Sequence, residues 1–210
     1  MVSALHGTLL PHDLLWGLTP GQLPAEVPAW AVAAMAAGQP VVVRRALTAP
    51  GQVAVGVRGA LREQRYATLM AVADIQRRVR PEDLCHVESD RGWPALQALA
   101  QLRASLDSGS WTWGVSGSAG FELASGVPAL HQASDLDLIL RTEQPMSREQ
   151  ARTLLALLDG AACPVDMQLQ VPNGAVALRE WAGASPRVLL KSASGARLVD
   201  DPWQALEQVA

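Results

Sequence analysis

The chain has 210 residues, of which 49% are hydrophobic, and its formal net charge is −3 at pH 7. This apolar content is well above that of disordered chains and predicts a folded protein, either one large domain or two small ones. The small negative charge argues against a protein that binds polyanions through its overall charge.

Targeting segments and disulfides are not expected. No apolar stretch approaches the roughly 18 residues that a membrane span needs, and the N-terminus lacks the basic and apolar regions of a secretory signal. The two cysteines, Cys85 and Cys163, are too few for a disulfide framework and are not at metal-ligand spacing. We therefore predict a cytoplasmic protein without a membrane partner.

Residues 1–83 are predicted to form a small α/β module. A helix is expected between Pro28 and Pro40, with Gly38 as its stop. Two strands follow, "VVVRRAL" and "QVAVGVRG". The next stretch, "ALREQRYATLMAVADIQRRV", has apolar residues near helical spacing and is interpreted as a long helix.

The polar, turn-rich segment "RPEDLCHVESDRGW" is the predicted boundary, after which residues 84–210 form a second domain. Amphipathic helices are predicted for "PALQALAQLRASLDSG", closed by Gly109, and for "SREQARTLLALLDGA", with Ser147 as N-cap. Strands are predicted for "SDLDLILRT" and "CPVDMQLQV", a short helix for "VALREWAG", and two extended pieces around Gly195. The whole chain therefore predicts an α+β fold with a mixed sheet in its second half.

Two carboxylates interrupt the apolar strand "SDLDLIL". Alternation along a strand places Asp135 and Asp137 on one face, which we expect to be the core side. Burying unpaired like charges is costly, and a third carboxylate, Asp166, lies on the next predicted strand. One or two Mg²⁺ ions would relieve this repulsion, because carboxylate and phosphate oxygens are the ligands that Mg²⁺ prefers. We therefore predict that these three aspartates are catalytic and hold metal.

The segment "GSAGFEL" places Gly117 and Ser118 at the entry to a helix, where free backbone N–H groups can cradle an anion. Taken alone, a Gly-Ser pair is a common turn and cap, and a D-x-D strand often turns its polar face to water. Both motifs in order, followed by a third Asp on a strand, favour chemistry on a phosphate.

The order of these motifs resembles the signature of the nucleotidyltransferase superfamily, whose catalytic sheet is polymerase-β-like. Further stretches resemble the phosphoribosyl-dephospho-CoA transferase family, the holo-acyl-carrier-protein synthases of bacterial malonate decarboxylase. They are "HDLLW", "GVRGALREQR", "WGVSGSAGFELASG", "VDMQLQ", "GAVALREW" and "DDPW", between His12 and Trp203. The gap from Ser118 to Asp135 is longer than is usual in the superfamily.

The resemblance implies a defined reaction. Family members transfer phosphoribosyl-dephospho-CoA from 2′-(5″-triphosphoribosyl)-3′-dephospho-CoA to a serine of the decarboxylase acyl carrier subunit, and diphosphate leaves. Asp135 and Asp137 would hold Mg²⁺ against the triphosphate, while Gly117 and Ser118 would bind its β and γ oxygens. Asp166 would complete the metal site or accept the serine proton.

Three arginines in "GVRGALREQR" are candidates for substrate binding. Arg58, Arg62 and Arg65 are expected near the start of the long helix, with Arg62 and Arg65 on one face. Such a run is ordinarily a solvated helix face. The resemblance favours a surface that binds phosphate or docks an acidic carrier protein.

Two other functions stay open. One keeps the chemistry but changes the acceptor, to a small molecule or RNA. The net charge of −3, with one Tyr and one Phe, argues against a nucleic-acid partner. The other is a non-catalytic escort that binds the carrier or the coenzyme, although such a protein has no need of a costly carboxylate cluster.

Overall fold

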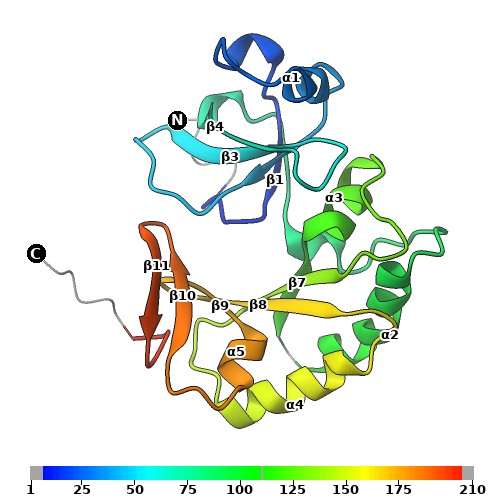
Figure 1. Cartoon of the computed structure of the whole chain (residues 1–210), viewed down its shortest axis with the longest axis vertical. Helices are drawn as coiled ribbons and strands as arrows, with labels where there is room; N and C mark the ends of the chain where they lie inside the picture. Colours follow the sequence, from blue (N-terminus) through cyan, green and yellow to red (C-terminus); the bar gives the residue numbers. More distant parts are fainter. Residues whose placement is uncertain (1–6, 110, 205–210) are drawn as a thin grey trace, which may run out of the picture. The chain divides into compact units, whose positions relative to one another are not determined.

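The computed structural model describes residues 7–109 and 111–204. The chain divides into two compact units, each with its own sheet (Figure 1). The units are Met1–Arg80 with Phe121–Ala129, and Pro81–Gly120 with Leu130–Ala210. This arrangement confirms the predicted α+β class, in which an N-terminal module precedes a domain with a mixed sheet.

The first unit is built on an antiparallel sheet of five strands in the order β4-β3-β2-β1-β5. Its strands are β1 (Leu14–Trp16), β2 (Val41–Val43), β3 (Gln52–Arg58), β4 (Arg65–Ala71) and β5 (Arg77–Val79). Its helices are η2 (Pro20–Gln22), α1 (Ala29–Ala36) and η3 (Val72–Asp74). Helix α1 lies where the sequence predicts it, and Gly38 follows it with a φ of +68°, the left-handed conformation of a helix stop.

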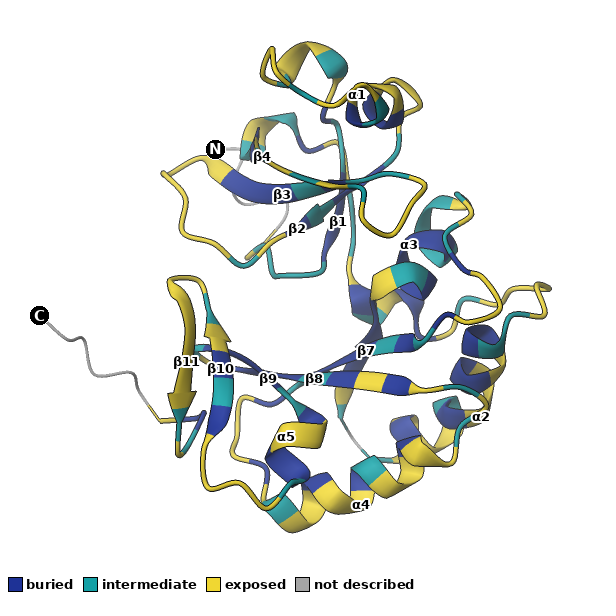
Figure 2. Ribbon diagram, viewed as in Figure 1, coloured by how far each residue is buried: buried dark blue, intermediate teal, exposed yellow. Residues whose placement is uncertain are grey.

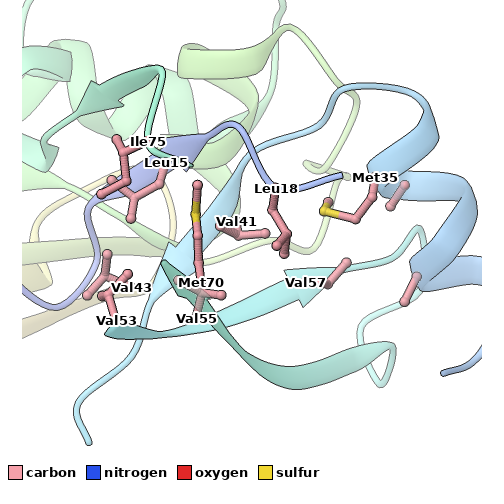
Figure 3. Packing of buried hydrophobic residues seen from close by; sticks show 12 residues of the cluster. Leu15, Leu18, Met35, Val41, Val43, Val53, Val55, Val57, Met70 and Ile75 are labelled. Carbon is pink, nitrogen blue, oxygen red and sulfur yellow. The ribbon is translucent and has the colours of Figure 1, made fainter. Parts of the chain in front are cut away.

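Apolar side chains from α1 and one face of this sheet form the first core (Figure 3). Leu15, Val41 and Val55 are completely buried there, and Met35 of α1 is 3% exposed. Burying each such side chain contributes about 1.5–3 kcal/mol to folding. This core therefore packs α1 against one face of the sheet.

The predicted long helix after β3 is wrong. The segment instead forms a hairpin loop, β4, η3 and β5. On β4 the exposed residues alternate with less exposed ones, which is the two-residue period of a strand. The exposed residues are Arg65, Ala67 and Leu69, and those between them are Tyr66, Thr68 and Met70.

The second unit contains a six-stranded sheet in the order β11-β10-β9-β8-β7-β6, in which β7 and β8 are parallel and the other pairs antiparallel. Its strands are β6 (Thr112–Val115), β7 (Leu136–Arg141), β8 (Val165–Val171), β9 (Gly174–Ala177), β10 (Val188–Ser192) and β11 (Gly195–Val199). Strand β9 was not predicted, and its last two residues, Val176 and Ala177, were assigned to the short helix that follows.

Helices cover this sheet, and the buried sides of α2, α4 and α5 are turned toward it (Figure 2). The helices of this unit are η4 (Pro81–Leu84), α2 (Pro94–Ser108), α4 (Arg148–Asp159) and α5 (Leu178–Ala182). Helix α3 (Gly117–Ser125) begins in this unit, and its residues from Phe121 on belong to the first. Two predicted helix ends are confirmed: Gly109 closes α2, and the Ser147 hydroxyl caps α4 by accepting from the Gln150 N–H at 3.1 Å. Among the described residues, every helix is too short or too polar to cross a membrane.

Candidate active site

The parallel pairing of β7 with β8 brings together the three aspartates that the sequence singled out. Asp137 on β7 is directly opposite Asp166 on β8, and Asp135 immediately precedes β7. One oxygen from each carboxylate lies within 4.8 Å of the other two. Because residues two apart on a strand share a face, the sheet itself holds this carboxylate cluster.

The cluster does not lie on the core side of the sheet, contrary to the sequence prediction. The buried residues at this end of β7 are instead Leu136 and Leu138, which alternate with the aspartates and are 0% and 1% exposed. Asp135 and Asp137 point to the other face and are partly exposed, and Asp166 is exposed. Partial hydration lowers the cost of holding like charges together and leaves the oxygens accessible to ligands.

A glycine brings the start of helix α3 into contact with the cluster. The Ser116 N–H donates to the Asp137 carbonyl at 2.9 Å, and the Gly120 N–H donates to the Ser116 carbonyl at 2.8 Å as the helix begins. Gly117 between them has a φ of +59°. A Cβ atom at this position would overlap the Asp137 carboxylate, so both the conformation and the space require glycine.

Helix α3 therefore points its N-terminus at the carboxylates. It has nine residues and begins at Gly117, and the N–H groups of a first helical turn point beyond the end of the helix. These N–H groups and the helix dipole favour negative charge. Beside three carboxylates, this end of the helix is suited to the phosphate groups of a metal-bound substrate.

Two neighbours of the cluster were missed by sequence reasoning. Ser116 follows β6, and its backbone N–H anchors the end of that strand to the Asp137 carbonyl. Cys163 lies in the turn before β8, where burial raises the pKa of its thiol and the charge of Asp135 raises it further, against a lowering hydrogen bond to the Leu136 backbone. No sequence signal pointed to Cys163, because its spacing to Asp166, with two residues between them, matches no known motif.

The three arginines lie in the first unit, and their predicted helical placement is wrong. Arg58 ends β3 and is paired across the hairpin with Arg65, the first residue of β4, while Arg62 lies in the connecting loop. The Arg58 guanidinium lies 5.3 Å from the centre of the Phe121 ring and donates to the Ala129 carbonyl at 3.3 Å. Arg58 therefore makes contacts within the first unit, and its ligand role stays a prediction.

Comparisons with known proteins identify the family of the chain. Two sequence models of domain families match the chain. Phosphoribosyl-dephospho-CoA transferase MdcG N-terminal domain matches residues 10–81, and phosphoribosyl-dephospho-CoA transferase MdcG C-terminal domain matches residues 83–202. No solved structure matches the chain.

Curated proteins named phosphoribosyl-dephospho-CoA transferase are similar over nearly the whole length. One from Pseudomonas fluorescens strain Pf-5 is 72% identical, and the match covers 97% of this chain and 98% of that protein. Another, from Pseudomonas fluorescens strain Pf0-1, is 64% identical with the same coverage of 97% and 98%. A third, from Azotobacter vinelandii, is 52% identical, and the match covers 95% of this chain and 98% of that protein. The chain therefore belongs to the phosphoribosyl-dephospho-CoA transferase family, whose members are transferase enzymes.

Proposed function

We propose that this enzyme transfers phosphoribosyl-dephospho-CoA from 2′-(5″-triphosphoribosyl)-3′-dephospho-CoA to a serine of the malonate decarboxylase acyl carrier protein. The observation that carries the proposal is the cluster of Asp135, Asp137 and Asp166, whose oxygens lie within 4.8 Å of one another beside the start of helix α3. A cytoplasmic location, expected from the sequence, is part of the same proposal.

The carboxylate cluster fits a magnesium ion. All three donors are carboxylate oxygens, the ligands that Mg²⁺ takes together with substrate phosphates. When bound, Mg²⁺ would neutralise negative charge on the triphosphate and polarise the phosphorus that is attacked. Asp135, Asp137 and Asp166 would hold it, and none of the three is deeply buried.

The chain's own groups position the donor. The helix start at Gly117 and Ser118 would bind the β and γ oxygens of the triphosphate, which fixes the diphosphate as the leaving group. The carrier serine oxygen then attacks the α phosphorus and forms a phosphodiester bond. The bond from the α phosphorus to the bridging oxygen breaks, and its electron pair leaves with diphosphate.

The serine proton needs an acceptor, and Asp166 is the best candidate. It is the most exposed carboxylate of the three, so an incoming hydroxyl can reach it most easily. Asp166 also fits the metal role, because its Cα is directly opposite that of Asp137. Arg58, Arg62 and Arg65 remain candidates for binding the phosphates or the carrier.

Mass spectrometry tests the reaction directly. The purified enzyme is mixed with the apo carrier protein, the triphosphate donor and Mg²⁺, and the carrier is expected to gain the mass of phosphoribosyl-dephospho-CoA. Asp135→Asn and Asp137→Asn should each abolish the gain, since one cluster charge is lost. Asp159→Asn is the matched control, because it removes an exposed carboxylate of the same unit that pairs with Arg179.

Each other outcome points to a different function. Transfer to a different hydroxyl compound, and not to the carrier, would identify an enzyme with another acceptor. Binding of the apo carrier or of the coenzyme without any mass gain would identify an escort. A gain that survives both cluster variants would place the chemistry elsewhere in the chain.

A further inference from the structure

The two parts of the sequence carry opposite charge. Residues 1–80 contain eight arginines and four acidic residues, a formal charge of +4, which leaves −7 on residues 81–210. The small net charge of the whole chain hides this division. The first unit also contains Glu122, which lowers its formal charge from +4 to +3, and it is the part that would attract an anionic partner.

Several of these arginines share one surface of the first sheet. On the edge strand β4, Arg65, Ala67 and Leu69 are exposed and point away from the core. Arg44 continues this face, because its side chain lies over Gly56, which is paired with Ala67. We define the strand-edge surface by five residues: Arg44, Arg62, Arg65, Ala67 and Leu69.

The loop before β4 is held rigidly by hydrogen bonds. The Arg65 guanidinium donates to the carbonyls of Leu61 at 3.3 Å and Gln64 at 2.9 Å, and the Gln64 side chain accepts from the Leu61 N–H at 3.1 Å. Arg62 is exposed in this loop. Partial burial lowers the pKa of Arg65, and the nearby positive charge of Arg62 lowers it further. A negatively charged ligand would relieve this repulsion.

Apolar groups accompany the arginines on this surface. Leu69 is 47% exposed on β4, and Leu61 is 54% exposed in the adjoining loop. A phosphate group would pair with the guanidinium groups but would leave these leucines in water. A protein surface can cover both, and arginines beside apolar side chains are typical of protein interfaces.

We propose that the strand-edge surface docks an acidic protein, and that this protein is the carrier that accepts the transferred group. The inference rests on the proposed function for the identity of the carrier. The arginines attract the acidic carrier, while Leu69 and Leu61 supply apolar area that water leaves on docking. Arg62 and Leu69 serve as contact residues.

Two variants test the docking surface, each with a matched control on another edge strand. Arg62→Glu and Leu69→Ser alter the strand-edge surface. Arg197→Glu and Leu198→Ser make the same changes on β11, the edge strand of the second sheet, where Leu198 is 53% exposed. Binding of fluorescently labelled apo carrier is measured directly, and the KM values for carrier and donor are measured by mass spectrometry.

The strand-edge variants should raise the Kd and the KM for the carrier about tenfold each, while the KM for the donor stays within about twofold. The Arg62→Glu variant should also lose part of the salt dependence of carrier binding. The two β11 variants should bind the carrier like the unmodified chain. Unchanged carrier binding in both strand-edge variants would overturn the proposal.

The remaining outcomes separate docking from the reaction. A rise in the KM for the donor alone would show that the surface binds phosphate, which also overturns the docking proposal. If the unmodified chain binds the carrier without transferring to it, and the variants lose binding, then docking stands and the proposed reaction fails. If the unmodified chain does not bind the carrier, docking fails, whatever acceptor the enzyme uses.

Discussion

The two units place carboxylates in opposite ways. In the first, the fully buried Asp13 is paired with Arg78 at 2.7 Å, so the chain supplies the neutralising charge itself. In the second, Asp135, Asp137 and Asp166 lie within 4.8 Å of one another on a partly exposed face. A buried ion pair is a structural solution, whereas a cluster of like charges costs stability until a cation binds. The first unit thus neutralises a buried carboxylate internally, whereas the second leaves three carboxylates accessible to a cation.

The largest expected effect comes from Gly117→Ala, which would push a methyl group into the Asp137 carboxylate. We expect turnover in the carrier assay to fall on the order of 10³-fold, because the cluster and the start of α3 are both displaced. Gly126→Ala is the control, since Gly126 has a similar φ of +73° but open space around it. If both variants lost equal activity, backbone strain rather than the carboxylate contact would be the cause.

Asp13→Asn tests the structural side of the comparison. The variant leaves the Arg78 charge in a site where its side chain is only 13% exposed. We expect the free energy of unfolding to fall by about 3–5 kcal/mol in urea titrations, as for other broken buried pairs. Asp159→Asn breaks an ion pair whose side chains are 57% and 52% exposed, and should cost no more than about 1 kcal/mol. If both variants lost the same free energy of unfolding, the buried ion pair would stabilise the fold no more than the exposed one does.

Asp135→Asn tests the cost of the cluster. Removing one of three like charges should stabilise the metal-free protein by about 1 kcal/mol, which raises its melting temperature by about 2–4 °C. Addition of Mg²⁺ should stabilise the unmodified chain and have less effect on the variant. Melting curves with and without Mg²⁺ measure both shifts. A variant that melts below the unmodified chain without Mg²⁺ would show that the carboxylates do not repel one another.

The smallest effect concerns Cys85. Burial, more than the charges of Glu82 and Asp107, raises the pKa of its thiol to about 12, and the thiol donates to the Trp113 carbonyl at 3.1 Å. The neutral thiol therefore stabilises the folded state fully below the ordinary thiol pKa, and this contribution is lost as the pH rises toward 12. Urea titrations at pH 8 and pH 10.5 measure how far the free energy of unfolding falls between the two pH values. The fall should be larger for the unmodified chain than for Cys85→Ala. Equal losses would contradict the raised pKa.

The sequence was most informative where several signals agreed. Helix α4 has a Ser cap, a clear apolar stripe and a glycine after its last residue, and its position was predicted correctly. The glycine turn before α3 and the aspartates on β7 and β8 were also recognised. That the three aspartates come together was predicted, but the pairing of Asp137 with Asp166 on a parallel neighbour was not, because no local signal specifies it.

The errors occurred where a short pattern fitted two periods. The apolar residues of β4 fit a helix loosely, but the exposed Arg65, Ala67 and Leu69 follow the two-residue period of a strand. The placement of the aspartates on the core side failed for another reason. Alternation shows which residues share a face but not which face is buried, and here the buried residues are Leu136 and Leu138.

The parallel pairing of β7 and β8 also sets when the site is assembled during folding. Asp137 and Asp166 are 29 positions apart in the chain, whereas Arg58 and Arg65 of the β3–β4 hairpin are 7 apart. Pairings between distant positions form more slowly than local ones, because more chain entropy is lost on closing the loop. The hairpin that carries part of the docking surface is therefore complete while the carboxylates are still apart. A newly made chain would gain its partner-binding edge before its chemistry.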